Sequence, residues 1–343
     1  MDKDDAGQYI RMAESFGYLA RLPYTFRVLS PALAGIALGG SIRGFIAITL
    51  VSLVCAGAAL FLLQRILGLS RTSSGAGMAL FLVSGGSTRL LTTPTYVDAL
   101  TYATEAIGLA LILLVKPIGL AALVSVAVAN RETAGLLLPA AYGSAAWRHR
   151  GVRTFLWPAI ACGTVGLAIV ILKLGLTSAP WSQLAPNSRT FDQRPPGLTE
   201  LFDLYSTFGA LWPLAAIYLP GPRALRGPGA VFAALIALQL VVSRGDEGRN
   251  LSHVFPVLIP IAMLAVEEAS RRPNHRLLVG ILVIAVAAGM VNARWVWIPD
   301  PTIRYVLVGV GSVVATALGI WLRVSERSGP PSAPARHPWA TPP

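Results

Sequence analysis

The chain has 343 residues, of which 54% are hydrophobic and 13% charged, and its mean hydropathy is +0.63. A soluble domain carries about 25% charged residues, so this composition excludes an ordinary soluble globule and an intrinsically disordered chain. The net charge of +12 does not indicate a nucleic-acid partner, because the basic residues lie between long apolar segments and form no single stripe. The composition predicts an all-α, polytopic membrane protein whose basic residues mark span ends near anionic lipid.

Apolar segments recur along the chain and predict a transmembrane helical bundle of about 10 or 11 spans. A bilayer core about 30 Å thick needs roughly 20 apolar residues per helix, and Phe45–Leu67 is the clearest run of that kind. Several of the other candidate spans fall short of 20 residues and are expected to be tilted partners, broken helices or runs whose ends reach into loops. The other candidates are Met78–Leu91, Ala99–Val115, Ile118–Ala129, Ala134–Trp147, Phe155–Leu176, Ser206–Leu219, Ala230–Ser243, Val254–Val266, Leu277–Val291 and Tyr305–Leu322.

Residues 1–44 predict an N-terminal segment at the membrane surface. The run Val28–Gly39 is apolar but too short to span a bilayer, and it contains a proline and ends in two glycines. The polar stretch Asp5–Ala20 precedes it and is amphipathic. The bundle itself is expected over residues 45–323, and the Pro- and Ser-rich tail 324–343 is expected to be disordered.

The orientation of the bundle is predicted from its charges. Basic residues near the span ends divide evenly between the two sides, so they do not decide the topology alone. If Phe45–Leu67 runs inward, most acidic residues fall outside, the Pro-, Ser- and Asn-rich segment 177–200 is an outer loop, and the C-terminus is cytoplasmic. The abundance of Arg, Ala, Gly and Pro is typical of a bacterial protein, which places the expected bundle in a bacterial inner membrane.

The N-terminal stretch offers the first candidate site. Asp4, Asp5 and Tyr9 lie in its polar part, where a carboxylate can act as a general base or hold a divalent cation. Arg27 follows at the membrane surface, where its planar guanidinium can bind a phosphate. The alternative is a solvated N-terminus whose acids cap the first helix.

A second candidate site combines Asp98 with Glu105. These residues are seven positions apart, which places them two turns along one face of an apolar helix. An ionisable group inside a span is costly and is a functional candidate by default. The alternatives are that Asp98 caps the helix and that Glu105 is neutral and hydrogen-bonded to a neighbouring helix.

Two further charged runs interrupt the apolar pattern. Arg131 and Glu132 are adjacent and cannot face one another on a helix, so each needs a separate partner. The alternative is a polar connection between two short helices. Asp246 and Arg249 lie in a glycine-flanked run that leads into a proline-containing helix, which suits the wall of an active site. The alternative there is a local ion pair. The histidines show no HExxH pattern, so a histidine metal site has no support.

These residues together resemble a known family. The pattern Asp5-x-x-x-Tyr9, followed by Phe26-Arg27-Val-Leu-Ser-Pro31, resembles the first outer loop of bacterial GT-C-type membrane glycosyltransferases, which include dolichyl-phosphate-mannose and polyprenyl-phosphate-sugar transferases. Asp98, Arg131-Glu132-Thr133 and Asp246-x-x-Arg249 fall where such proteins carry similar patterns. The resemblance extends loosely over residues 5–266.

The resemblance implies a membrane glycosyltransferase with a lipid-phosphate-linked sugar as donor. Asp5 is then the expected base, or the ligand of a divalent cation if one is bound, with Asp4 as the second choice. Arg27, Arg131 and Arg249 are expected to face the donor phosphate. Members of this family carry a span ahead of the loop and none precedes Asp5 here, so the chain either lacks that span at its start or is a relative that does without it.

Two other functions are compatible with the same residues. A transporter or lipid flippase would place an ionisable side chain such as Glu105 near the membrane midplane, although no internal repeat is visible. A non-catalytic assembly partner of the cell envelope would need no catalytic acid, and the absence of the family's first span fits it.

Overall fold

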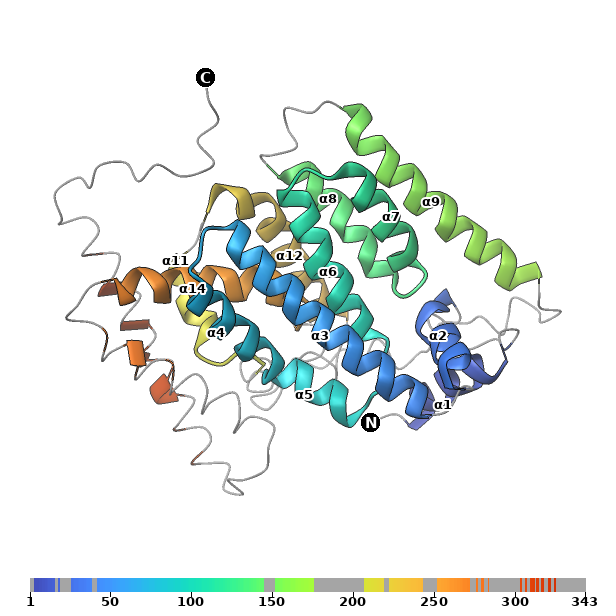
Figure 1. Cartoon of the computed structure of the whole chain (residues 1–343), viewed down its shortest axis with the longest axis horizontal. Helices are drawn as coiled ribbons and strands as arrows, with labels where there is room; N and C mark the ends of the chain where they lie inside the picture. The colour runs from blue at the N-terminus through green and yellow to red at the C-terminus, as the bar shows by residue number, and fades with distance from the viewer. Residues whose placement is uncertain are drawn as a thin grey trace.

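The structure is a computed structural model that describes most of the first 271 residues. The described ranges are 3–15, 18, 26–38, 42–144, 152–175, 207–218, 222–242 and 252–271, with scattered positions between 276 and 324. The regular elements within these ranges are all helices, with no strand among them, which confirms the all-α class (Figure 1).

The helices follow one another closely through the first part of the chain. They are α1 (Lys3–Glu14), α2 (Leu29–Leu38), α3 (Ile42–Ile66), α4 (Arg71–Leu82), α5 (Gly85–Thr92), α6 (Asp98–Leu113), α7 (Pro117–Val128), α8 (Leu137–Gly143), α9 (Val152–Gly175), α11 (Leu211–Tyr218), α12 (Arg223–Val242) and α14 (Phe255–Ser270). Two 3₁₀ helices, η2 (Glu132–Leu136) and η5 (Ser252–Val254), lead into α8 and α14.

Three helical segments of the described ranges are long and apolar enough to cross a membrane. They are Ile42–Ile66, Leu156–Lys173 and Ser252–Ser270, with 25, 18 and 19 residues. The chain is therefore a helical membrane protein. The larger count of about 10 or 11 spans stays a prediction.

Several predicted segments lie in parts of the chain that the structure does not describe. The outer loop 177–200, the tail beyond Val324 and most of the last two candidate spans lie outside the described residues.

The expected span Met78–Leu91 is a broken helix, which is one of the forms predicted for the shorter runs, because the chain divides there into α4 and α5. Ser84 has an extended backbone, with φ of −62° and ψ of 155°, and its Oγ accepts a hydrogen bond from the Ser87 amide at 3.4 Å. This is the geometry of a helix N-cap, so Ser84 starts a new helix. The apolar side chains on both sides disguise the break in a hydropathy reading.

Helices α3, α6 and α14 form the centre of the bundle, and α4 lies along α3 (Figure 1). Phe81 of α4 stacks on Phe255 of α14, with ring centroids 4.3 Å apart. Tyr102 of α6 meets Phe255 edge to face at 5.4 Å. These rings close the core around the N-terminal half of α6.

Polar contacts identify two opposite ends of the bundle. At one end, Thr49 of α3 donates a hydrogen bond to the Pro94 carbonyl at 3.0 Å, and Phe45 packs in one cluster with Val97, so α3 and α6 begin together. At the other end, the Ser70 amide donates to Glu267 at 2.8 Å, so α14 ends against the start of α4. The first end, where the candidate residues collect, is called the arm end below.

Helices α1 and α2 form an N-terminal arm that packs on the arm end of the bundle. Tyr9, Met12 and Val28 of the arm share a buried cluster with Phe45 and Val97. The arm lies within residues 1–44, whose position at the membrane surface stays a prediction. Its second helix, at 10 residues, is too short to span a bilayer.

Glycines make the helix crossings of the arm possible. An ideal Cβ on Gly35 of α2 would lie 2.6 Å from the Ala13 carbonyl oxygen of α1, and one on Gly44 of α3 would lie 2.6 Å from that of Ala34. Small residues permit such close approach of helix backbones, as they do at many crossings in membrane proteins.

We expect Gly35→Ala to lower the free energy of unfolding by about 1–2 kcal/mol, because overpacking costs about 1–3 kcal/mol and the gain in helix propensity offsets part of that. Gly7→Ala in α1 is the matched control, since its added Cβ meets no described atom within 4 Å apart from its own chain neighbours and helix backbone. Equilibrium unfolding in detergent micelles measures both variants. Equal stability of the Gly35 variant and the wild type would contradict the tight crossing.

Candidate functional site

Four charged or titratable side chains meet in the interior at the arm end. They are Asp98, Glu105, Arg131 and His253, and each side chain is at most 4% exposed. We call them the buried charge cluster. They come from α6, from the residue before η2, and from η5, so three separate elements must pack correctly to assemble it.

Helix α6 presents both carboxylates of the buried charge cluster on one face. Asp98 and Glu105 are seven residues apart, which corresponds to about 10 Å along a helix axis. The imidazole of His253 fills the space between them. Its Nε2 lies 3.3 Å from Asp98 Oδ1, and its Nδ1 lies 2.9 and 3.0 Å from the two carboxylate oxygens of Glu105. The sequence prediction that the two acids share a face is confirmed.

Arg131 pairs with Asp98 through its Nη1 atom. The same Nη1 lies 2.8 Å from His253 Nε2. Val97 is the N-cap residue of α6 and Asp98 is the first residue of the helix, so Asp98 does not occupy the cap position. Its carboxylate pairs with Arg131 because a buried charge is stabilised best by an opposite charge and hydrogen bonds.

The backbone at Arg131 explains how this side chain reaches the cluster. Helix α7 ends at Val128, and the Arg131 amide donates to the Ala127 carbonyl at 3.0 Å. Arg131 itself is extended, with φ of −157° and ψ of 135°, before η2 begins. This extended residue separates α7 from η2, and it is the polar interruption that the sequence pattern indicated.

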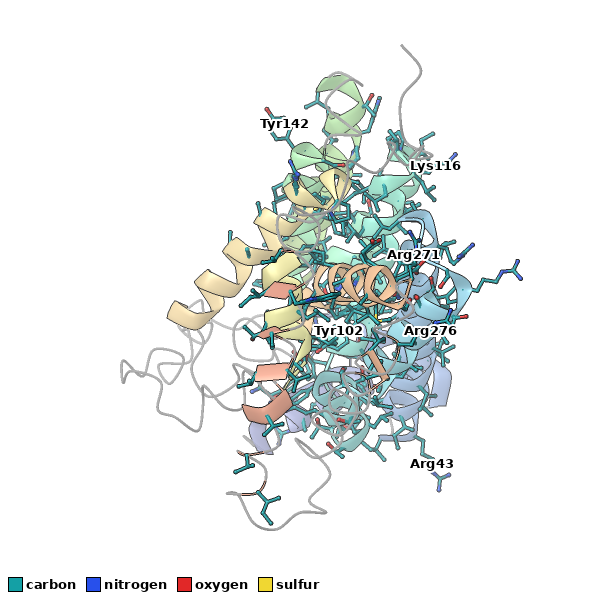
Figure 2. All side chains as sticks on the ribbon, turned by 90° about the vertical axis from the view of Figure 1, so that its left-hand side faces the viewer. Arg43, Tyr102, Lys116, Tyr142, Arg271 and Arg276 are labelled. Carbon is teal, nitrogen blue, oxygen red and sulfur yellow. The ribbon has the colours of Figure 1, made fainter. Side chains whose placement is uncertain are left out.

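An aromatic wall holds the imidazole in place. The Tyr102 ring meets the His253 ring edge to face, with centroids 5.0 Å apart and planes at 77°. Gly86 of α5 lies against the same wall, where an added Cβ would collide with the Ser252 side chain and lie 3.4 Å from the Tyr102 hydroxyl. Figure 2 shows Tyr102 in the middle of the molecule, whereas Arg43 and Lys116 extend at its periphery.

Asn130 connects the N-terminal arm to the neighbourhood of the buried charge cluster. It is buried, it accepts a hydrogen bond from Ser30 Oγ of α2 at 2.5 Å, and it donates to the Val97 carbonyl at 2.8 Å and to Thr101 Oγ1 at 2.9 Å. The Leu29 amide adds a bond to the Ala129 carbonyl at 3.0 Å. The arm and the start of α6 are therefore joined through one amide side chain.

Tyr9 and Arg27 of the first candidate site lie on the N-terminal arm, at the arm end of the bundle. Arg27 is buried and donates to the Tyr9 hydroxyl at 3.4 Å. Lys173, at the end of α9, donates to the Tyr18 carbonyl at 3.4 Å. Two buried cations thus lie on the arm and beside it.

The structure brings together only some of the residues expected from the sequence. Asp98, Glu105 and Arg131 meet in the buried charge cluster, and Tyr9 contacts Arg27 on the arm. The other expected site residues are not described at side-chain level. Asp4 and Asp5 lie in the first turn of α1 and Glu132 begins η2, with backbone described only, whereas Asp246 and Arg249 lie outside the described residues.

Sequence reasoning gave His253 no role, yet it touches three members of the cluster. The available signal was local: Ser252-His253 directly precedes an apolar helix that begins Phe255-Pro256. A histidine at the start of a span has no solvent partner once buried, so it needs partners from other helices.

The buried charge cluster does not fit a metal ion. Among the residues that the structure describes, no group of three His, Cys, Asp or Glu side chains is placed to hold one. The Arg131 guanidinium lies between Asp98 and His253, where a cation would meet its positive charge. The expectation that Asp5 ligates any divalent cation stays a prediction.

The chain matches no protein-family model, no curated protein and no solved structure. Its function is therefore inferred from the residues described above.

Proposed function

We propose that the chain is a GT-C-type membrane glycosyltransferase that transfers a sugar from a polyprenyl-phosphate-linked donor to an acceptor. The observation that carries this proposal is the attachment of the N-terminal arm beside Arg131, through the Ser30–Asn130 bond at 2.5 Å and the Leu29–Ala129 bond at 3.0 Å. The arm bears the two acids of the resemblance in the first turn of α1. Arg27 and Arg131 lie at the same end of the bundle.

The chemistry assigns one role to the acids and another to the arginines. The acceptor hydroxyl oxygen attacks the anomeric carbon, and the bond from that carbon to the donor phosphate breaks, with its electron pair leaving on the phosphate. Asp5 takes the hydroxyl proton, with Asp4 as the second choice. Arg27 binds the phosphate, and Arg131 is the second hydrogen-bond donor expected for it.

The surface of the bundle suits a lipid-linked donor and membrane lipids as partners. Helix α9 exposes Trp157, Ile160, Leu167 and Ile171, and α3 exposes Val51 and Val54. Exposed apolar side chains that lie together on a helix face in this way are typical of a surface that contacts lipid or another protein. In the proposed orientation, the arm end lies on the extracytoplasmic face of a bacterial inner membrane and the C-terminus is cytoplasmic.

We expect Asp5→Asn to reduce sugar transfer by about 10²–10⁴-fold, because an amide cannot accept the hydroxyl proton. The measurement is transfer of labelled sugar by the full chain in proteoliposomes, with a panel of polyprenyl-phosphate sugars as donors. Glu14→Gln, an exposed acid in the same helix, is the control and should leave transfer unchanged. Full activity of the Asp5 variant would reject that residue as the base, and no transfer from any donor would reject the proposed activity.

A second candidate, a proton-coupled transporter or lipid flippase, is favoured by a different observation. Glu105 is a carboxylate buried on a helix face against His253, as proton-carrying groups in transporters are. The test measures uptake of a labelled lipid or solute into proteoliposomes under an imposed proton gradient. Uptake that depends on the gradient and is lost in Glu105→Gln would support transport. If the proton gradient has no effect on uptake by the wild type or by Glu105→Gln, proton-coupled transport is excluded.

A further inference from the structure

His253 lies at the centre of the buried charge cluster, and each of its ring nitrogens faces a different group. Nε2 is 2.8 Å from Arg131 Nη1. Nδ1 is 2.9 and 3.0 Å from the carboxylate oxygens of Glu105. The side chain is 3% exposed, and its ring packs against Tyr102 with the two ring planes at 77°. These distances determine where the imidazole proton resides.

The contact with Arg131 requires a lone pair on Nε2. A guanidinium only donates hydrogen bonds, and it stays charged in proteins. A proton on Nε2 would therefore set one N–H against another at 2.8 Å. Asp98 Oδ1, which is 3.3 Å from the same nitrogen, accepts from Arg131 and needs no proton from the ring.

The contact with Glu105 then takes the ring's proton. With Nε2 as acceptor, a neutral imidazole carries its hydrogen on Nδ1, which donates to the Glu105 carboxylate. The hydrogen bonds run in one direction, from Arg131 to His253 and from His253 to Glu105. A carboxylate that fixes the tautomer of a histidine in this way orients the ring toward its other partner.

We infer that Glu105 and His253 are positioning residues that hold the Arg131 guanidinium in one orientation through a single histidine tautomer. Arg131 Nη1 has two acceptors, Asp98 and His253. Both depend on α6, because Asp98 belongs to that helix and Glu105 of the same helix holds the His253 ring. Loss of Glu105 frees the ring to place its proton on Nε2. That proton would face the guanidinium and displace it from Asp98.

This inference changes the role expected for Glu105 from the sequence. Glu105 acts on Arg131 from the far side of the imidazole and needs no contact with a substrate. The effect of Glu105 on catalysis rests on the proposed function, in which Arg131 stabilises the phosphate of the lipid-linked donor. The tautomer itself is a property of the chain without substrate.

The test is nitrogen NMR of the full chain labelled with ¹⁵N-histidine in lipid nanodiscs near neutral pH. His253→Gln identifies the His253 signals by their loss. We expect one protonated nitrogen, Nδ1, and one unprotonated nitrogen, Nε2, in the wild type. Glu105→Gln keeps an acceptor oxygen and should keep this pattern, whereas Glu105→Leu should give the opposite tautomer or a mixture.

Two outcomes would overturn the inference. An imidazolium or an Nε2 proton in the wild type would remove the lone pair that Arg131 needs. An unchanged Nδ1 proton in folded Glu105→Leu would show that Glu105 does not hold the tautomer. If the leucine variant fails to fold, Glu105→Ala takes its place, and an unchanged Nδ1 proton in that variant has the same meaning. None of these signals depends on sugar transfer, so failure of the proposed activity is distinguishable.

Discussion

Replacing Arg131 by methionine is expected to lower the free energy of unfolding by about 3–5 kcal/mol, because breaking a buried ion pair leaves the other charge without compensation. Asp98 is 1% exposed and loses its ion-pair partner in this variant, and His253 Nε2 loses its donor at 2.8 Å. Methionine retains most of the apolar stem, so lost packing contributes little. Equilibrium unfolding in detergent micelles measures the change.

Arg271→Met is the matched control for this prediction. Arg271 also pairs with acids, Glu267 at 3.0 Å and Glu268 at 3.8 Å, but its side chain is 64% exposed. Exposed pairs contribute about 0–1 kcal/mol, so this variant should be nearly as stable as the wild type. The double variant Asp98→Asn with Arg131→Met should recover about 1–3 kcal/mol relative to additivity. Similar losses at Arg131 and Arg271 would contradict the burial of the cluster.

Asn130→Leu is expected to cost about 2–4 kcal/mol and to loosen the N-terminal arm. The amide makes three hydrogen bonds, to Ser30, Val97 and Thr101, and leucine leaves each partner without that bond. A buried polar group left unsatisfied costs about 1–3 kcal/mol, and partial access of water reduces the sum. Hydrogen exchange of the α2 amides should become faster than in the wild type, whereas exchange in α14 should change less.

Ser30→Ala separates the arm contact from the others. It removes only the bond at 2.5 Å between the arm and Asn130, so we expect a loss of about 1 kcal/mol with the same direction of change in α2 exchange. If α2 exchanges as slowly in Asn130→Leu as in the wild type, the arm is held by its apolar cluster and not by this amide.

The sequence predicted the helices well where a segment was apolar throughout. The run Phe45–Leu67 corresponds to α3 (Ile42–Ile66), because an uninterrupted apolar stretch leaves no competing signal. The hydropathy of the run Met78–Leu91 did not show where the helix breaks, because the signal of the flanking residues outweighed Ser84, whose capping geometry splits the segment. Helix ends set by one side chain are harder to predict than helix interiors.

The candidate site, too, was predictable from the sequence only in part. The seven-residue spacing placed Asp98 and Glu105 on one face, and the adjacency of Arg131 and Glu132 showed that Arg131 needed a partner elsewhere. His253 escaped notice, because it lies 148 residues from Glu105 and 122 from Arg131. Helical periodicity tells which side chains share a face, but it carries no information about what covers that face.

Composition and periodicity alone determined that this chain is an all-helical membrane protein with costly charges on the buried face of α6 and before η2. Which charges compensate each other was decided only when α6, η2 and η5 packed together. The physical reason is that a charge in an apolar interior must find an opposite charge or a hydrogen-bond partner, and the partner within reach depends on how distant helices cross. The union of Asp98, Arg131, His253 and Glu105 is thus a property of the tertiary structure.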